Sequence, residues 1–204
     1  DFAILDASLT LSLPLEISIY TVMDALSHSF ESIWNKNANT TSTAYAIESI
    51  SLIIQYIEPL KQSPKDKEIR NKLLRASNKA GLAFSNTKTA AAHSISYPLT
   101  IHHNIPHGIA SSISLIPLLM INRNFIKESL DRICEINNIT FDQLVQFIRS
   151  IPGNYISYKL KDWGISKNKL EGLAKESFTK GRMENNIVDL YVMDVKQILY
   201  SIYN

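Results

Sequence analysis

The sequence is poor in several features that mark particular protein classes. Only one of its 204 residues is cysteine, so no internal disulfide framework can form, which fits a reducing compartment such as the cytoplasm. The formal net charge is only +2, which gives no broad basic surface for nucleic acid. No apolar run reaches the ~18 residues that a membrane-spanning helix needs. These absences argue against a secreted disulfide-rich domain, a nucleic-acid-binding protein and a membrane protein.

Glycine is also scarce, and this limits what the chain can bind. The six glycines never cluster, so no glycine-rich loop that cradles phosphate groups is available. The chain begins Asp1-Phe2-Ala3, without the positively charged start of a signal peptide and without methionine, which suggests a fragment or processed piece. With 45% apolar and 20% charged residues, the chain is long enough for one domain with a substantial core.

Apolar residues recur at helical spacing almost throughout the chain. Strand-like alternation is confined to Phe2–Leu5, which could form one short strand. The pattern predicts helices at about residues 15–34, 43–60, 65–84, from 90 onward, 108–120, 125–136, 141–151, 167–179 and 194–203. We therefore expect residues 1–204 to form a single all-α, bundle-like domain.

Histidines are concentrated in one part of the chain. Four of the five lie between His93 and His107, and the fifth, His28, follows Asp24 by four residues. That spacing places a carboxylate and an imidazole on the same face of a helix. Asp24, His28, His93 and His107 are therefore a possible ligand set for a divalent transition metal, and such a set suits Zn²⁺ or Fe²⁺. On spacing alone, hydrogen-bonded structural histidines are an equally good explanation.

Several ordered motifs point to a known family. These are Asp24-Ala-Leu-x-His28-x-x-Glu31, then Gly81-x-Ala-Phe-x-Asn86, and then His93 followed by Ile-Pro-His107-Gly108. Over nearly its whole length the chain resembles the C-terminal helical domain of iron-containing (group III) alcohol dehydrogenases, which share the dehydroquinate synthase-like fold. In that family one aspartate and three histidines bind the metal. The resemblance implies this role for Asp24, His28, His93 and His107.

The resemblance also implies a second domain. Family members carry an N-terminal α/β domain that binds NAD(P)H through a Gly-Gly-Gly-Ser loop, and nothing in this chain matches it. Residues 1–14 would then be the segment that arrives from that missing domain. We expect the cofactor-binding residues to lie mostly outside the chain, the isolated 204 residues to be inactive, and the full-length protein to be a homodimer.

The ligand set implies Lewis-acid activation of an aldehyde carbonyl, with hydride supplied by a nicotinamide. Many family members have a further histidine four residues after the third ligand, and here that position is Tyr97. A tyrosine hydroxyl can relay a proton, so Tyr97 is the candidate catalytic residue. A packing or substrate-contact role for Tyr97 is equally compatible with the sequence.

The segment from Lys88 to Tyr97 is most similar to the phosphonoacetaldehyde reductase branch, whose product is 2-hydroxyethylphosphonate. Lys88 stands where many simple alcohol dehydrogenases have glycine or another neutral residue, and a cation there would suit a dianionic substrate. His103 is a second candidate for substrate binding. The alternatives are that Lys88 is only a solvent-exposed loop residue, or that the chain is an inactive metal-binding fragment or a helical scaffold or interaction module.

Overall fold

A computed structural model describes residues 3–204 of the chain. It confirms the all-α class, because no strand occurs among these residues and only Asn35 and Asn186 form an isolated antiparallel bridge. The predicted short strand is wrong for the residues described: Ala3–Leu5 have no regular secondary structure and are exposed, while Phe2 lies outside the described residues. Within residues 3–204, no single helix is long and apolar enough to cross a membrane, although the bent pair His107–Asn122 and Lys127–Asn137 passes by length and composition.

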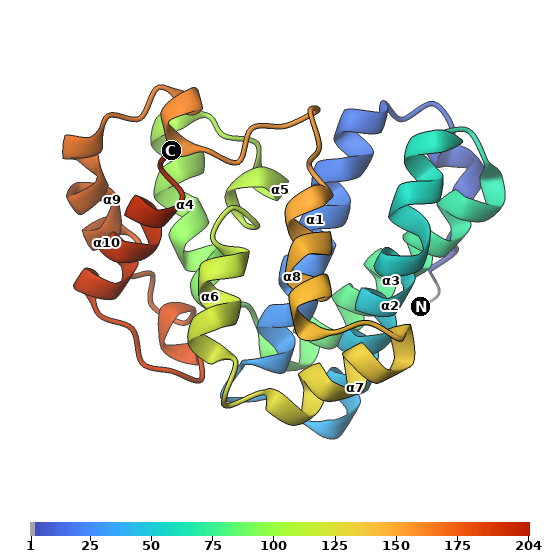
Figure 1. The fold of residues 1–204 in the computed structure, drawn as a ribbon, viewed down its shortest axis with the longest axis horizontal. Helices are drawn as coiled ribbons and strands as arrows, with labels where there is room; N and C mark the ends of the chain where they lie inside the picture. Colours follow the sequence, from blue (N-terminus) through green and yellow to red (C-terminus); the bar gives the residue numbers. More distant parts are fainter. Residues whose placement is uncertain (1–2) are drawn as a thin grey trace.

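Three long helices form one half of the molecule. Helix α1 (Leu15–Ile33) follows Pro14, and it lies in the centre of the fold, with α2 (Thr40–Gln62) and α3 (Lys67–Thr87) packed against it (Figure 1). The start of α2 is fixed by a capping box in which Asn39 and Ser42 bond reciprocally, and Asp66 caps α3 through the amide of Ile69. These caps satisfy amide groups that a helix start otherwise leaves unpaired.

The other half begins with α4 (Ala91–His103), whose first turn is completely buried at Ala91 and Ala92. The predicted helix over 108–120 is broken in two. Helix α5 (His107–Ala110) is followed by a turn and then by α6 (Leu115–Asn122). The cause is a run of serines whose hydroxyls compete with the helical hydrogen bonds. Ser112 donates to the carbonyl of Gly108 at 2.5 Å, and Ser27 of α1 donates to the carbonyl of Ser111 at 2.7 Å.

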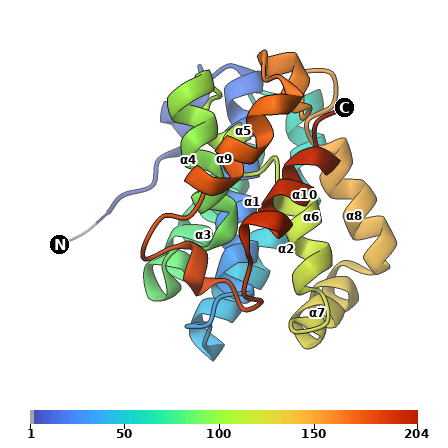
Figure 2. The ribbon, with the colours of Figure 1, turned by 90° about the vertical axis from the view of Figure 1, so that its left-hand side faces the viewer.

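The last third contains α7 (Lys127–Asn137), α8 (Phe141–Ser150), α9 (Leu170–Glu176) and α10 (Val192–Ser201). Four short 3-10 turns complete the fold: η1 (Ala7–Thr10), η2 (Leu160–Trp163), η3 (Lys167–Lys169) and η4 (Met183–Asn185). The segment before α1 leaves the helices on the side of α3 and α4, whereas α8 and the C-terminus lie on the opposite side (Figure 2). The region between α1, α4 and α5 is where the predicted ligands meet.

Candidate metal centre

The first two predicted ligands lie one turn apart on α1. Nδ1 of His28 is 3.7 Å from Oδ2 of Asp24. Both side chains are largely covered, with exposed fractions of 16% for His28 and 23% for Asp24. Phe84 of α3 stacks on the His28 ring at a centroid distance of 4.3 Å and so restricts the ring's rotation. The helical spacing of four thus produces the pairing expected from the sequence.

The other two predicted ligands reach the same point from α4 and α5. Nε2 of His93 lies 3.5 Å from Oδ1 of Asp24, and Nε2 of His107 lies 3.7 Å from that same oxygen. Ligating atoms of Asp24, His28 and His93 lie within 4.8 Å of one another. All four predicted side chains are therefore brought together, with His107 at the exposed edge of the cluster.

The close approach of α5 to α1 depends on Gly108. A Cβ at this position would lie 2.3 Å from the backbone oxygen of Tyr20 in α1, which is far inside van der Waals contact. Any side chain would therefore push α5 away from α1. Because His107 precedes this glycine directly, the contact sets how near the fourth imidazole comes to Asp24.

A buried carboxylate, Glu31, holds His93 in position. Its Oε2 lies 2.5 Å from Nδ1 of His93, and its Oε1 accepts from the His93 backbone amide at 3.1 Å. Helix α4 has no side-chain cap of the usual kind. Glu31 therefore caps α4 and orients the His93 ring with the same carboxylate.

The charges of the cluster favour an ionised Glu31. Burial alone would raise the pKa of Glu31, but the charge of His93 and the amide hydrogen bonds outweigh burial and lower it. For His93, burial opposes protonation, but Glu31 and Asp24 outweigh it and raise the pKa to about 9. The pKa of His28 is lowered to about 4, mainly by burial and then by the charge of His93. The region therefore stabilises positive charge at one point, between two carboxylates.

The donor set fits a divalent transition metal. Among the described residues, Nε2 of His93 is buried and has no hydrogen-bond partner, yet it faces Asp24. Glu31 keeps a proton on Nδ1, which leaves Nε2 as the ligating atom, the arrangement that carboxylates commonly impose on metal-binding histidines. Asp24 is fixed in turn by the Ser111 hydroxyl, which donates to Oδ1 at 2.5 Å. Three imidazoles and one carboxylate suit Zn²⁺ or Fe²⁺.

The remaining predicted residues are not part of this cluster. Lys88 is exposed, and it follows α3 with φ 66° and ψ 177°, a conformation that glycine adopts far more easily. Tyr97 lies one turn after His93, and its ring is covered by the guanidinium of Arg182 at 4.7 Å. The structure gives His103 no hydrogen bond to the cluster. Burial, Lys169 and His102 lower the pKa of its imidazole.

Three residues of this region were missed as functional residues from the sequence. Glu31 was noticed only as part of a motif, although its distance from Asp24 and His28 places it on their helix face. Ser111 and Arg182 carry no local signal, because each acts on a residue far away in the chain. Ser111 bonds Asp24, and Arg182 reaches Thr89 with Nη1 to Oγ1 at 3.0 Å.

The fold and the cluster can be compared with known proteins. A model of the Fe-containing alcohol dehydrogenase family, C-terminal, matches residues 18–203. The chain belongs to this family. Long-chain-alcohol dehydrogenase 1 of Geobacillus thermodenitrificans is 30% identical over 200 residues, which cover 90% of this chain and 49% of that protein. NAD-dependent methanol dehydrogenase of Bacillus methanolicus is 28% identical, covering 97% of this chain and 54% of that protein.

Solved structures with the same helical arrangement are also known. Sulfoacetaldehyde reductase from Bifidobacterium kashiwanohense, solved with NAD⁺, superposes with a TM-score of 0.87 at 28% identity, covering 97% of this chain and 53% of that one. An alcohol dehydrogenase from Oenococcus oeni shares the fold with a TM-score of 0.88 at 20% identity, covering 97% of this chain and 54% of that one. The family member described here thus spans about half the length of the relatives it matches.

Proposed function

We propose that this chain forms the metal- and aldehyde-binding half of an NAD(P)-linked alcohol dehydrogenase or aldehyde reductase. The observation that carries the proposal is the meeting of Asp24, His28, His93 and His107 at one point, with Glu31 fixing the His93 ring. A divalent metal at this point, Fe²⁺ or Zn²⁺, would supply Lewis-acid polarisation of a carbonyl.

The side chains around the cluster would bind and orient the aldehyde. Phe84 covers one face of His28, and the exposed edge of His107 leaves one side of the cluster open. Tyr97, one turn after His93, remains our candidate for proton transfer to the reduced oxygen, and its hydroxyl has no hydrogen-bond partner within residues 3–204. The hydride would come from a nicotinamide that is bound mostly by residues outside this chain.

The cofactor and the assembly of the whole protein belong to the same proposal. Relatives in this family include enzymes named NAD-dependent and NADPH-dependent, so we propose NAD(P)H without choosing between the two. We also propose a homodimer for the full-length protein and a cytoplasmic location, which the single cysteine favours.

For the substrate, we propose a small anionic aldehyde, and specifically phosphonoacetaldehyde reduced to 2-hydroxyethylphosphonate. Lys88 supports this because it is exposed and no carboxylate in the described part of the chain pairs with its ammonium group. It also follows Phe84, the residue that covers His28, by four residues. The relative named sulfoacetaldehyde reductase acts on an aldehyde that also carries an anionic group. His103 is proposed as a second, more distant contact.

Metal analysis and turnover test the proposal in the full protein that carries this chain. Wild-type protein should contain one divalent metal ion per chain and should oxidise NADH or NADPH when an aldehyde is added. Asp24→Asn and His93→Ala should lose both properties, whereas His102→Ala, a histidine outside the cluster, should keep them. Turnover that persists in metal-free protein or in His93→Ala would refute the proposal. Metal binding without turnover would favour the alternative that the chain belongs to an inactive metal-binding scaffold.

Lys88→Ala tests the substrate. The ratio of kcat/KM for phosphonoacetaldehyde to kcat/KM for propanal should fall roughly ten- to a hundredfold, because one charge-assisted contact is lost. The metal content should stay at the wild-type value. An equal loss of kcat/KM on both aldehydes would show that Lys88 is only a solvent-exposed loop residue.

A further inference from the structure

Arg182 is a cation without an acidic partner beside the candidate site. Its guanidinium lies over the Tyr97 ring at 4.7 Å, and Nη1 donates to Oγ1 of Thr89 at 3.0 Å. No carboxylate of residues 3–204 lies within ion-pair distance of it. The nearest acidic residue in sequence, Glu184, instead accepts hydrogen bonds from the backbone amides of Gly181 and Arg182 at 2.6 and 3.2 Å.

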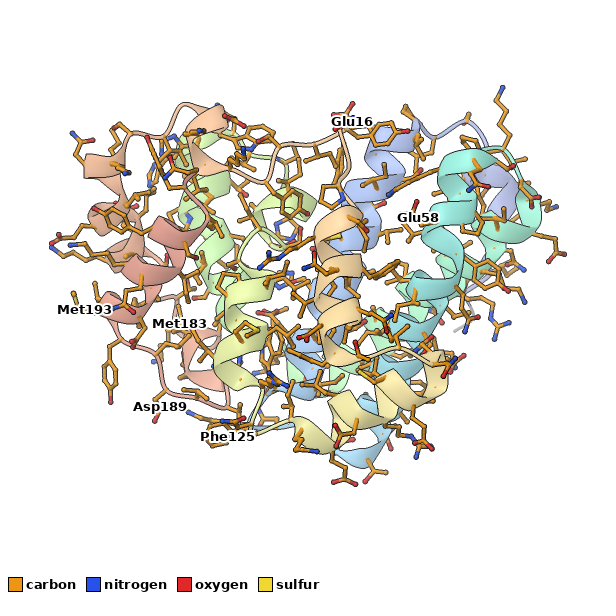
Figure 3. The ribbon with its side chains drawn as sticks, in the orientation of Figure 1. Glu16, Glu58, Phe125, Met183, Asp189 and Met193 are labelled. Carbon is orange, nitrogen blue, oxygen red and sulfur yellow. The ribbon has the colours of Figure 1, made fainter. Side chains whose placement is uncertain are left out.

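The loop that carries Arg182 is held firmly against α4. Met183 inserts into the core with 6% exposure, and Figure 3 shows it inside the outline of the molecule while Met193 lies at the edge. Nδ2 of Asn185 donates to the carbonyl of Thr89 and to the carbonyl of Gly181, both at 2.9 Å. The loop and the start of α4 therefore form one unit, and Arg182 is positioned before any ligand arrives.

Arg182 touches the stripe of α4 that carries His93. Thr89 lies in the non-helical segment before α4, His93 lies in the first turn of that helix, and Tyr97 follows four residues later on the same face as His93. Arg182 contacts the first and the last of these three. Lys88 directly precedes Thr89, so it neighbours in the chain a residue that Arg182 contacts.

We propose that Arg182 recognises the anionic group of the substrate together with Lys88, and that it determines the preference for charged aldehydes. This inference rests on the proposed function of the cluster. The guanidinium has a planar fork that matches two oxygens of a phosphonate, whereas the Lys88 ammonium adds a point charge. The Tyr97 ring holds the fork flat by a cation–π contact.

Methylphosphonate is the probe for the test, because it carries the anion and has no carbonyl. Its Kd for the full protein that carries this chain is measured by calorimetry for wild type, Arg182→Gln and Arg182→Lys. Arg182→Gln should weaken binding roughly ten- to a hundredfold, and Arg182→Lys should recover part of the loss. The matched control is Arg123→Gln, since Arg123 also stacks on an aromatic ring, that of Phe141 at 3.9 Å, and should leave the Kd unchanged.

Turnover then separates recognition from a structural effect. Arg182→Gln should lower kcat/KM for phosphonoacetaldehyde much more than for propanal. Equal losses on the two aldehydes, or an unchanged methylphosphonate Kd, would overturn the inference. If the proposed function fails instead, metal content and propanal turnover are absent in wild type, and the methylphosphonate titration still decides whether Arg182 binds the anion.

Discussion

Glu31→Gln is the sharpest perturbation of the cluster, because it removes a charge and hardly changes the volume. In the wild-type protein, the two carboxylate oxygens accept from two different donors of His93, the backbone amide and Nδ1. Glutamine has only one oxygen for these two donors. If that oxygen keeps Nδ1, then the amide group of glutamine faces the backbone N–H of His93. If the amide group faces Nδ1, then the imidazole must carry its proton on Nε2, the atom that faces Asp24.

Both arrangements have a cost that can be estimated. A buried donor without a partner costs about 1–3 kcal/mol of stability. Loss of the carboxylate that orients a ligating histidine typically weakens metal binding by roughly 10–100-fold. That range corresponds to about 1.4–2.7 kcal/mol of binding free energy. We therefore expect both a lower melting temperature and a weaker metal site.

The assay is a competition titration of Zn²⁺ against a chelator of known affinity, with Co²⁺ absorption as a second readout of the ligand set. The control is Glu16→Gln, which changes an exposed glutamate at the start of the same helix, at the top of α1 in Figure 3. Glu16→Gln should bind Zn²⁺ as wild type does. Wild-type affinity in Glu31→Gln would show that Glu31 only fills space, and our account of the His93 ring would be wrong.

Three further predictions follow from the geometry around the cluster. Lys88→Gly should raise the free energy of unfolding by up to about 2 kcal/mol, because glycine relieves the positive φ, whereas Lys88→Ala should not; urea denaturation checks both. Gly108→Ala should lower the free energy of unfolding by about 1–3 kcal/mol and weaken metal binding. Gly172→Ala, where a Cβ meets no atom within 4 Å, should leave stability unchanged or raise it and leave metal binding unchanged. Thermal melting and metal titration check both variants. Because the pKa of His93 is raised to about 9, the stability that protonated His93 gives the metal-free protein should be complete below pH 6.5 and lost as pH rises through 9. Zn²⁺ affinity should instead increase over that range, because the metal competes with the proton. Melting curves and Zn²⁺ titrations at several pH values check these two opposite trends.

Helical periodicity predicted most of the fold because it records which residues face a core. The all-α class and the family membership are confirmed, and α1, α2, α3 and α8 lie close to their predicted ranges. The break between α5 and α6 was not predicted, since the apolar pattern continues across it. Its cause is a set of serine hydroxyl bonds, one of which comes from Ser27, 84 residues away in the chain.

In the candidate site too, features within one helix could be predicted, whereas contacts between distant parts of the chain could not. The spacing of Asp24 and His28 is a local property of one helix, so the sequence could pair them, and Glu31 at the next turn could have been added by the same rule. Which histidine Glu31 bonds could not be predicted, because 62 residues separate it from His93. Arg182 is 93 residues from Thr89, and only the folded loop brings the two together. The metal-ligand roles themselves stay a prediction.

The double role of Glu31 ties the proposed ligand to the winding of a helix. The carboxylate that orients the His93 ring also caps the first turn of α4, through the backbone amide of His93. The ring is buried and lies against the rings of His28 and His107, at centroid distances of 4.2 and 5.4 Å, which restricts rotation of the side chain. Release of an ion from His93 and fraying of the helix start would thus be a single local opening event, and the hydrogen-exchange rate of the His93 amide would measure it. The dissociation rate of an ion held in this way would then be limited by the rate at which the backbone at the start of α4 opens.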